Sequence, residues 1–254
     1  MIKRMTLTTA AMTLGFMAGT AGANLVETFD GAGYTAGNDV TTPPYMLSGP
    51  EQQFPTVAAF GFDGTQGATK AGTSAWGAAA RPTGVTGAAQ GFTYSWMFHE
   101  DATESGTTRL SGGIYTTHPI GANSYGAPRF GYEADGNGNQ LAMFFTDGPA
   151  VPTLTYDSDT WYEVLVTGTP AAGGWDVSVE HRIDAVGAYT TDLATTLWAK
   201  PGFVPAWAGL EMIGLDGNSA QDNIMVLDIP EPGVLALLGL GVVTMLVRRQ
   251  RRMI

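Results

Sequence analysis

The chain has 254 residues, of which 10% are aromatic and none is cysteine, and it carries a formal net charge of -11 at pH 7. This aromatic content excludes a disordered chain, and the lack of cysteine excludes thiol catalysis, iron–sulfur clusters, cysteine zinc sites and disulfides. Residues 24–229 hold six basic and 22 acidic side chains, a balance of -16. That balance excludes nucleic acid as a partner, because a phosphate backbone requires clustered lysine and arginine.

Residues 1–23 have the three parts of a signal peptide. Lys3 and Arg4 precede a mostly apolar stretch, and the small residues Ala21-Gly22-Ala23 close it. A buried N-terminal helix is the alternative, but no acidic residue occurs before Glu27. We therefore predict export, with Ala21 and Ala23 as the cleavage-site residues and a mature chain that begins at Asn24.

Residues 230–254 form a second ordered set of features at the other end of the chain. Pro230, Glu231 and Pro232 precede an apolar run over 233–247, and the basic cluster that follows consists of Arg248, Arg249, Arg251 and Arg252. A transmembrane helix over 233–247 would span about 22 Å, less than the roughly 30 Å of a hydrocarbon core. The arginines predict a cytoplasmic tail. The prolines predict an extended segment on the outer side, within reach of a processing enzyme.

This order of features resembles the PEP-CTERM sorting signal of Gram-negative bacteria. The resemblance covers residues 230–252, and Gln250, which interrupts the basic cluster, is a small departure from the pattern. It implies exosortase, a membrane protease-transpeptidase, as a partner, with the inner membrane holding the precursor during sorting. It also implies delivery to the cell surface or the extracellular matrix, often alongside exopolysaccharide. An ordinary single-pass tail anchor is the alternative.

The stretch 24–229 alternates apolar and polar residues with a period of two, which is typical of strands with one face in a core. Phe92, Tyr94, Trp96 and Phe98 share one face, and the segment 175–180 alternates in the same way. Further strands are expected over residues 109–117, 129–133, 141–146, 161–167, 210–215 and 223–229. No helix of four turns is expected before Gly233. The pattern predicts an all-β protein, an antiparallel β-sandwich held by its core.

Three segments of this domain resemble the concanavalin-like or laminin-G-like jelly roll. They are residues 24–30 at its start, residues 160–164 with the following strand from Trp175, and residues 222–226 as its closing strand. The resemblance implies a jelly-roll sandwich of two sheets over 24–229. Glycines concentrated between Gly61 and Gly91 favour long surface loops over a second domain.

Oxygen-bearing side chains gather in two places. Residues 135–139 alternate oxygens as a calcium loop does at its start, but Gln140 and Thr146 break that pattern, so a hairpin turn is expected there. The second place contains Asp216, Asn218 and Asp222, just before the last strand. Jelly rolls of the kind named above often bind calcium, so these three residues are the candidate calcium ligands, and no other cofactor is expected.

Motifs for catalysis are incomplete. The acidic string of a jelly-roll glycosidase, Glu-x-Asp-x-x-Glu, is matched only by Glu133 and Asp135, and the chain then enters a turn. His99-Glu100 lacks the second histidine of a metalloprotease, and there is no nucleophile elbow or phosphate loop. We therefore expect no enzyme.

A proline-interrupted segment over 197–207 carries Trp198 and Trp207. These rings either cap the core or stack on a sugar, since large aromatic side chains serve both purposes. The expected function is that of an exported, non-enzymatic, carbohydrate-binding protein of the cell surface or matrix. A purely structural matrix protein is the alternative, followed by a glycan-active enzyme.

Overall fold

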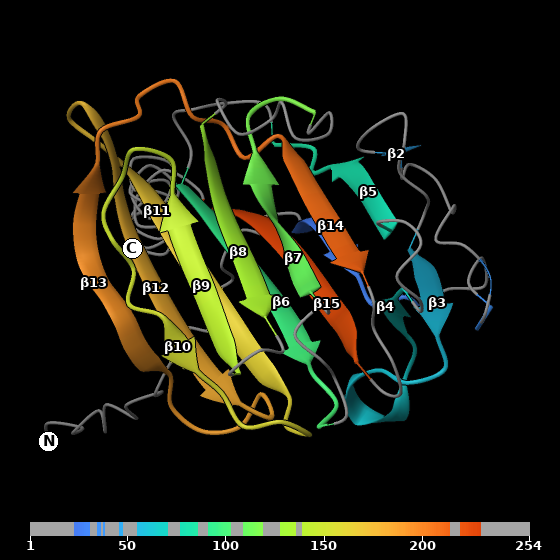
Figure 1. Ribbon diagram of the computed structural model, residues 1–254. Helices are drawn as coiled ribbons and strands as arrows, with labels where there is room; N and C mark the ends of the chain where they lie inside the picture. The colour runs from blue at the N-terminus through green and yellow to red at the C-terminus, as the bar shows by residue number, and fades with distance from the viewer. Residues whose placement is uncertain are drawn as a thin grey trace, which may run out of the picture.

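A computed structural model describes residues 23–30, 35–36, 38, 46–47, 55–70, 77–85, 91–102, 109–118, 128–135, 139–213 and 219–229. In this part of the chain nearly all regular structure is β, arranged as two antiparallel sheets packed face to face (Figure 1). The predicted all-β sandwich is confirmed.

Sheet A has the strand order β13-β12-β11-β6-β15-β4-β3, and β1 also pairs with β15. Its strands are β1 (Ala23–Glu27), β3 (Thr56–Ala58), β4 (Gly67–Thr69), β6 (Gly91–His99), β11 (Tyr162–Ala171), β12 (Gly174–Ile183), β13 (Thr190–Trp198) and β15 (Ala220–Ile229). Between β3 and β4 a short 3-10 helix, η1 (Phe62–Gly64), lies over the outer side of this sheet.

Sheet B has the order β10-β9-β8-β7-β14-β5-β2. Its strands are β2 (Met46–Leu47), β5 (Gly77–Pro82), β7 (Arg109–Tyr115), β8 (Arg129–Asp135), β9 (Gln140–Phe145), β10 (Leu154–Thr155) and β14 (Trp207–Ile213). Strands β8 and β9 form the expected hairpin, with Asp135 opposite Gln140. In Figure 1 this sheet faces the viewer, with β7, β8, β9 and β14 side by side.

Each strand range expected from alternation coincides with a strand of the structure apart from residues at its ends, whereas β5 and β13, the longest of the other strands, were not expected. The first reads Gly-Ala-Ala-Ala-Arg-Pro and the second is rich in threonine, so neither alternates large apolar with polar residues. Both segments form strands because they pair with neighbouring strands in the sheets, and strand formation depends on context more than on intrinsic preference.

The core is a slab of aromatic rings between the sheets. Phe92, Tyr94, Trp96 and Phe98 are buried on the inner face of β6, as predicted. The ring of Trp96 stacks on Tyr132 of the opposite sheet with centroids 4.0 Å apart. Burial of such rings contributes most of the stability of a sandwich that has no disulfide to support it.

A β-bulge interrupts β15 between Asp222 and Met225. Asn223 has a positive φ of 48°, which places an extra residue opposite β6. Because of this extra residue, both Gln221 and Ile224 point inward and are buried. Gln221 there accepts a hydrogen bond from the Tyr132 hydroxyl and donates one to the Ser111 carbonyl over 3.1 Å, which connects the two sheets.

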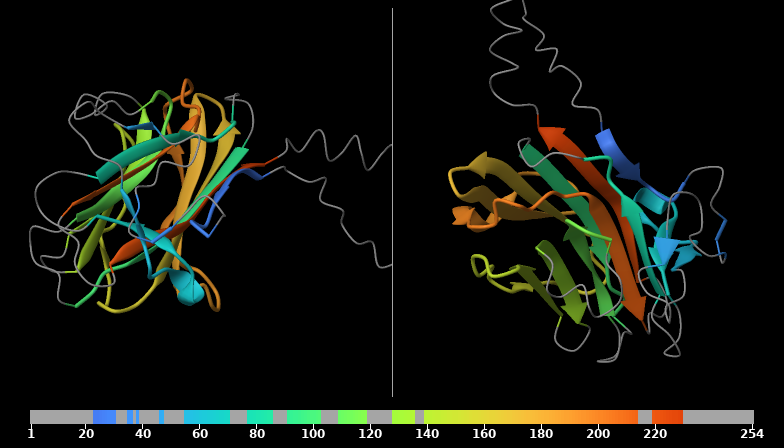
Figure 2. Two further views of the ribbon diagram at one scale, coloured as in Figure 1. Left: turned by 90° about the vertical axis from the view of Figure 1, so that its right-hand side faces the viewer. Right: turned by 90° about the horizontal axis from the view of Figure 1, so that it is seen from above.

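The first and last strands of the domain are neighbours. Ala23 of β1 pairs with Leu227 of β15, so the start of one strand lies beside the end of the other (Figure 2). Within the described residues no helix is long and apolar enough to cross a membrane. The predicted helix over 233–247, the sorting residues and Ala21 lie outside those residues.

Candidate functional site

Three rows of outward-facing residues cross the middle of sheet B. Their orientation follows from alternation, because their chain neighbours Ile114, Phe130 and Leu210 are buried in the core. The register aligns β14, β7 and β8. The first row consists of Trp207, Tyr115 and Arg129, the second of Gly209, Gly113 and Gly131, and the third of Glu211, Ser111 and Glu133.

Two positions of the glycine row require glycine. Gly113 has a φ of +148°, and a Cβ there would lie 2.1 Å from the Phe130 carbonyl oxygen. A Cβ on Gly131 would lie 2.5 Å from the ring of Phe144, which stands beside it on β9. The three glycines therefore contribute no side chains of their own between the flanking rows, and the ring of Phe144 lies over Gly131.

The row with Trp207 is aromatic and carries one positive charge. Trp207 is half-buried, and the ring of His118 meets it edge-on at 4.7 Å. The guanidinium of Arg129 lies 5.8 Å from the centre of the Tyr115 ring and 5.0 Å from that of Phe144. Burial lowers the pKa of His118, so its imidazole is neutral at pH 7.

The third row holds two carboxylates on either side of a small residue. Glu211 and Glu133 flank Ser111, so their Cα atoms are two strand spacings, about 10 Å, apart. Burial raises the pKa of Glu211. The charge of Arg129 opposes this rise and that of Glu133 adds to it. Burial and a nearby like charge thus favour the protonated form of Glu211.

The structure separates the two predicted stacking residues. Trp198 has no exposed surface, donates its indole N–H to the Thr146 carbonyl over 2.9 Å, and packs against Phe203 with ring centroids 4.6 Å apart. Trp198 therefore belongs to the core, because its ring lies at the end of the slab where β13 closes the sandwich. Trp207 is on the outer face of sheet B, so the two tryptophans do not form one platform.

Asp222 is buried and fully engaged by donors. Its Oδ2 accepts hydrogen bonds from the Phe62 amide (2.9 Å) and the Thr65 hydroxyl (3.1 Å), and its Oδ1 accepts one from the Asn223 amide (2.7 Å). These donors occupy the oxygens that a calcium ion would need. Among the described residues no group of three acidic or histidine side chains is placed to hold a metal. Asp216 and Asn218 lie outside those residues, so the calcium site stays a prediction.

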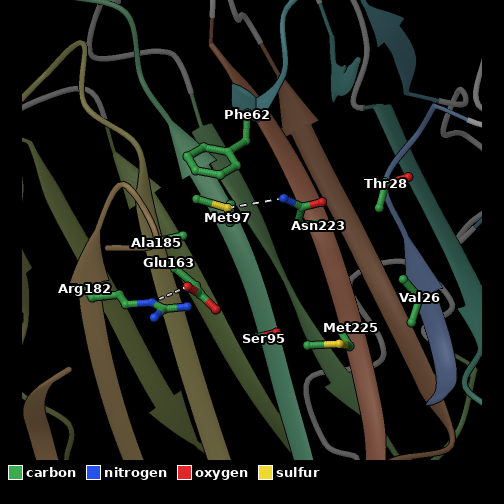
Figure 3. A pocket seen from close by; sticks show the side chains of 10 residues that line it. All are labelled: Val26, Thr28, Phe62, Ser95, Met97, Glu163, Arg182, Ala185, Asn223 and Met225. Carbon is green, nitrogen blue, oxygen red and sulfur yellow. Dashed lines mark hydrogen bonds and ion pairs between the residues drawn. The ribbon is translucent and has the colours of Figure 1, made fainter. Parts of the chain in front are cut away.

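The outer face of sheet A has a pocket of about 240 Å³ (Figure 3). Its lining residues are Val26, Thr28, Phe62, Ser95, Met97, Glu163, Arg182, Ala185, Asn223 and Met225. The polar groups in it bond to one another. Arg182 pairs with Glu163 over 2.5 Å, and the side-chain amide of Asn223 donates a hydrogen bond to the Met97 sulfur over 3.4 Å. Because these groups are satisfied within the fold, this pocket is a weaker candidate than sheet B.

Comparison with known proteins bears first on the C-terminal segment. Residues 228–252 match the family model of the PEP-CTERM protein-sorting motif. The chain carries a PEP-CTERM sorting motif. The motif indicates an exported protein with a membrane-anchoring sorting signal that exosortase processes. No curated protein matches the chain.

Solved structures resemble the sandwich. The catalytic domain of a glycoside hydrolase family 131 protein from Coprinopsis cinerea is 10% identical, with a TM-score of 0.50 over 73% of this chain and 84% of that one. The metal-free carbohydrate recognition domain of Emp46p is 12% identical, with a TM-score of 0.49 over 73% and 88%. The lectin UEA-II in complex with galactose is 12% identical, with a TM-score of 0.48 over 81% and 99%. The first of these, at 10% identity, shows a shared fold alone.

The sequence did not reveal the acidic row. Alternation along β14 places Trp207, Gly209 and Glu211 on one face, and the same reasoning places Glu133 outward on β8. No local sequence pattern indicates that β14 and β8 both pair with β7. The pair Glu211 and Glu133 depends on a register between residues about eighty positions apart, which a motif written along one strand cannot contain.

Proposed function

We propose that this exported protein binds an uncharged polysaccharide on the outer face of sheet B. The observation that carries the proposal is the glycine row of Gly209, Gly113 and Gly131, bordered by Trp207 on one side and by carboxylates on the other. The glycines put no side chains of their own between these rows, and the ring of Phe144, which lies over Gly131 and is 37% exposed, offers a flat apolar face to a sugar ring. Trp207 offers a ring face, and the polar rows offer hydrogen-bond partners for hydroxyl groups.

The charge of the domain favours a neutral ligand over a uronate polymer. The domain carries a balance of -16, and two of its carboxylates stand in the acidic row. Arg129 is 7% exposed and lies over two rings, which limits its reach toward an anionic chain. Like charges brought together in a partly buried site cost free energy. The destination, by this proposal, is the cell surface or the extracellular matrix, where such polymers occur.

Calorimetry with the full-length protein in detergent tests the proposal. The probes are cellohexaose and laminarihexaose as neutral chains and an alginate hexamer as the anionic one. We expect binding of at least one neutral probe, a loss of tenfold or more in affinity for Trp207→Ala, and no binding of alginate. Phe62→Ala, which removes an aromatic ring from the opposite face, is the matched control and should bind as the wild type does. A wild-type protein that binds neither neutral probe would leave the purely structural matrix role.

A second candidate function, hydrolysis of the bound polysaccharide, has a specific observation in its favour. Glu211 and Glu133 stand on either side of Ser111, and burial together with the charge of Glu133 raises the pKa of Glu211, against the opposing charge of Arg129. In this mechanism Glu211 gives its proton to the glycosidic oxygen as the bond to the anomeric carbon breaks. Water forms the new bond to that carbon, and Glu133 accepts the proton that the water releases.

Release of reducing ends from the bound neutral probe distinguishes the two functions. Hydrolysis predicts release by the wild type and a loss of at least a hundredfold in Glu211→Gln, whose affinity for the probe should stay within about threefold, because the amide keeps the shape of the side chain. Binding without release, in wild type and variant alike, would leave a carbohydrate-binding protein that is not an enzyme.

A further inference from the structure

The sorting motif begins inside the folded domain. The motif covers residues 228–252, whereas β15 extends to Ile229. In β15, Asp228 pairs with Phe92 and Ile229 pairs with Gly91 on β6. Residues 228 and 229 therefore belong both to sheet A and to the motif, and Pro230 follows with no linker between them.

The end of β15 is held in the middle of a sheet rather than at its edge. On one side it pairs with β6 up to Ile229, and on the other side β1 pairs with it from Glu27 opposite Ile224 to Leu25 opposite Val226, all within the mature chain expected to begin at Asn24. Val226, between these pairs, has no exposed surface and anchors the strand to the core. Figure 2 shows the end of β15 and the start of β1 side by side. Two neighbours thus fix the backbone that leads into the motif.

A processing enzyme that takes residues 228–229 as an extended peptide would need the main-chain groups that these residues use to pair with β6. Each residue has one N–H and one C=O on its main chain, and a group that already bonds to a neighbouring strand is not available to another partner. Enzymes and receptors that take extended peptides bind them through these main-chain groups. Cleavage of a folded protein accordingly proceeds from a locally opened state.

We propose that sheet A masks the start of the sorting motif, so that exosortase processes the exported protein only after the last pairs of β15 have opened. The folded domain then sets the rate of its own release from the membrane. Strand ends open far more readily than whole domains, so the opening leaves the rest of the sandwich folded. The inference concerns release of the protein, and it is independent of what sheet B binds.

A disulfide across the last pair of β15 tests the inference. The chain has no cysteine, so Gly91→Cys with Ile229→Cys creates a single possible bond in the oxidising periplasm. Paired Cα atoms of antiparallel strands lie about 4.5–5.5 Å apart, within the range of disulfides. The measurement is a pulse-chase of the full-length chain in cells that contain exosortase, with intact-mass analysis of the product. We expect processing to slow at least tenfold and to recover when dithiothreitol reduces the bond.

The matched control is Thr169→Cys with Asp176→Cys, which joins β11 to β12 near the same end of sheet A but leaves the pairing of β15 with β6 free to open. It should be processed at the wild-type rate. Processing of the Gly91–Ile229 pair at that same rate, with the disulfide shown to be closed, would overturn the inference.

A second variant works in the opposite direction and does not depend on disulfide formation. Six residues of Gly and Ser inserted between Ile229 and Pro230 separate the motif from the sheet. We expect processing to become several-fold faster, because the motif is then available without opening β15. The same six residues inserted after Ala172, in the turn between β11 and β12, should leave the rate unchanged. A linker at Pro230 that leaves the rate at the wild-type value would also count against the proposal.

Discussion

The outer faces of the two sheets use their polar residues differently. On sheet A the polar groups bond to one another or to backbone. The Glu163 carboxylate accepts hydrogen bonds from the Arg182 guanidinium and the Tyr189 hydroxyl. The Asp222 carboxylate accepts hydrogen bonds from two backbone amides and a hydroxyl. Aromatic side chains from the η1 segment and Trp161 then cover part of the face. The polar bonds of this face lie within the fold, and those to Asp222 oppose the rise that burial causes in its pKa.

On sheet B the carboxylate row and the glycine row lower the stability of the fold. Burial raises the pKa of Glu211, and the charge of Glu133 in the same row adds to this rise, although the charge of Arg129 opposes it. The glycine row adds a backbone conformation at Gly113 that side chains disfavour. Residues that lower stability without an evident return to the fold are expected at functional sites. The difference between the faces is the reason to look for a ligand on sheet B.

The largest effect on stability should come from the core that both faces share. Trp198→Ala removes a fully buried ring and its hydrogen bond to Thr146, so we expect a loss of about 3–5 kcal/mol in the free energy of unfolding. Trp207→Ala removes a half-buried ring from the outer face, and its cost should be about 1 kcal/mol. Urea denaturation of both variants measures the two values. Equal losses would place Trp207 in the core as well and remove it from the candidate site.

Glycine substitution sharpens the contrast on sheet B. Gly113→Ala places a Cβ 2.1 Å from a backbone oxygen at a positive φ, and we expect a loss of about 3 kcal/mol. Gly202→Ala is the control, since a Cβ there meets nothing within 4 Å, and it should change stability by less than about 0.5 kcal/mol. Melting curves of the two variants give the comparison. A Gly113→Ala protein as stable as the wild type would mean that the glycine row is not required by the backbone.

Alternation and composition were enough to predict the sandwich, because a half-buried strand shows its two faces directly in its sequence. The same reasoning failed for β5, whose run of alanines has no apolar contrast, and it grouped Trp198 with Trp207 because both occur in one broken segment. Only the register between strands shows that Trp198 closes the core and that Glu211 stands near Glu133. Those pairings join distant parts of the chain, and they were set by packing that no local pattern records.

The pH dependence of stability should expose the buried carboxylate of sheet A. Burial raises the pKa of Asp222 to about 7, although its hydrogen bonds oppose the rise. The folded protein therefore holds a proton that the unfolded chain, with an ordinary aspartate pKa of about 3.9, releases between these values. Stability from this group is fully present below pH 4 and is lost as the pH rises to 7, by at most about 1.4 kcal/mol per pH unit.

Urea midpoints of the wild type and of Asp222→Asn from pH 4 to pH 8 test this sign. The difference between the two proteins should change in favour of the asparagine variant as the pH rises, and it should be constant above pH 7. A difference that moves the other way would mean that the hydrogen bonds from Phe62, Thr65 and Asn223 outweigh the effect of burial.

The smallest effect should come from the ion pair at the rim of the sheet A pocket. Arg182 and Glu163 are partly exposed, with side-chain exposures of 25% and 12%, and water screens their attraction. Arg182→Gln should cost about 0.5 kcal/mol or less from the pair itself, and the Arg182 contact with the Tyr189 ring at 4.4 Å adds a similar small amount. The same variant should leave the affinity for a neutral hexasaccharide unchanged, because it lies on the face opposite Trp207. A tenfold loss of binding in Arg182→Gln would move the ligand site to sheet A, where the pocket of Figure 3 would then be the surface to explain.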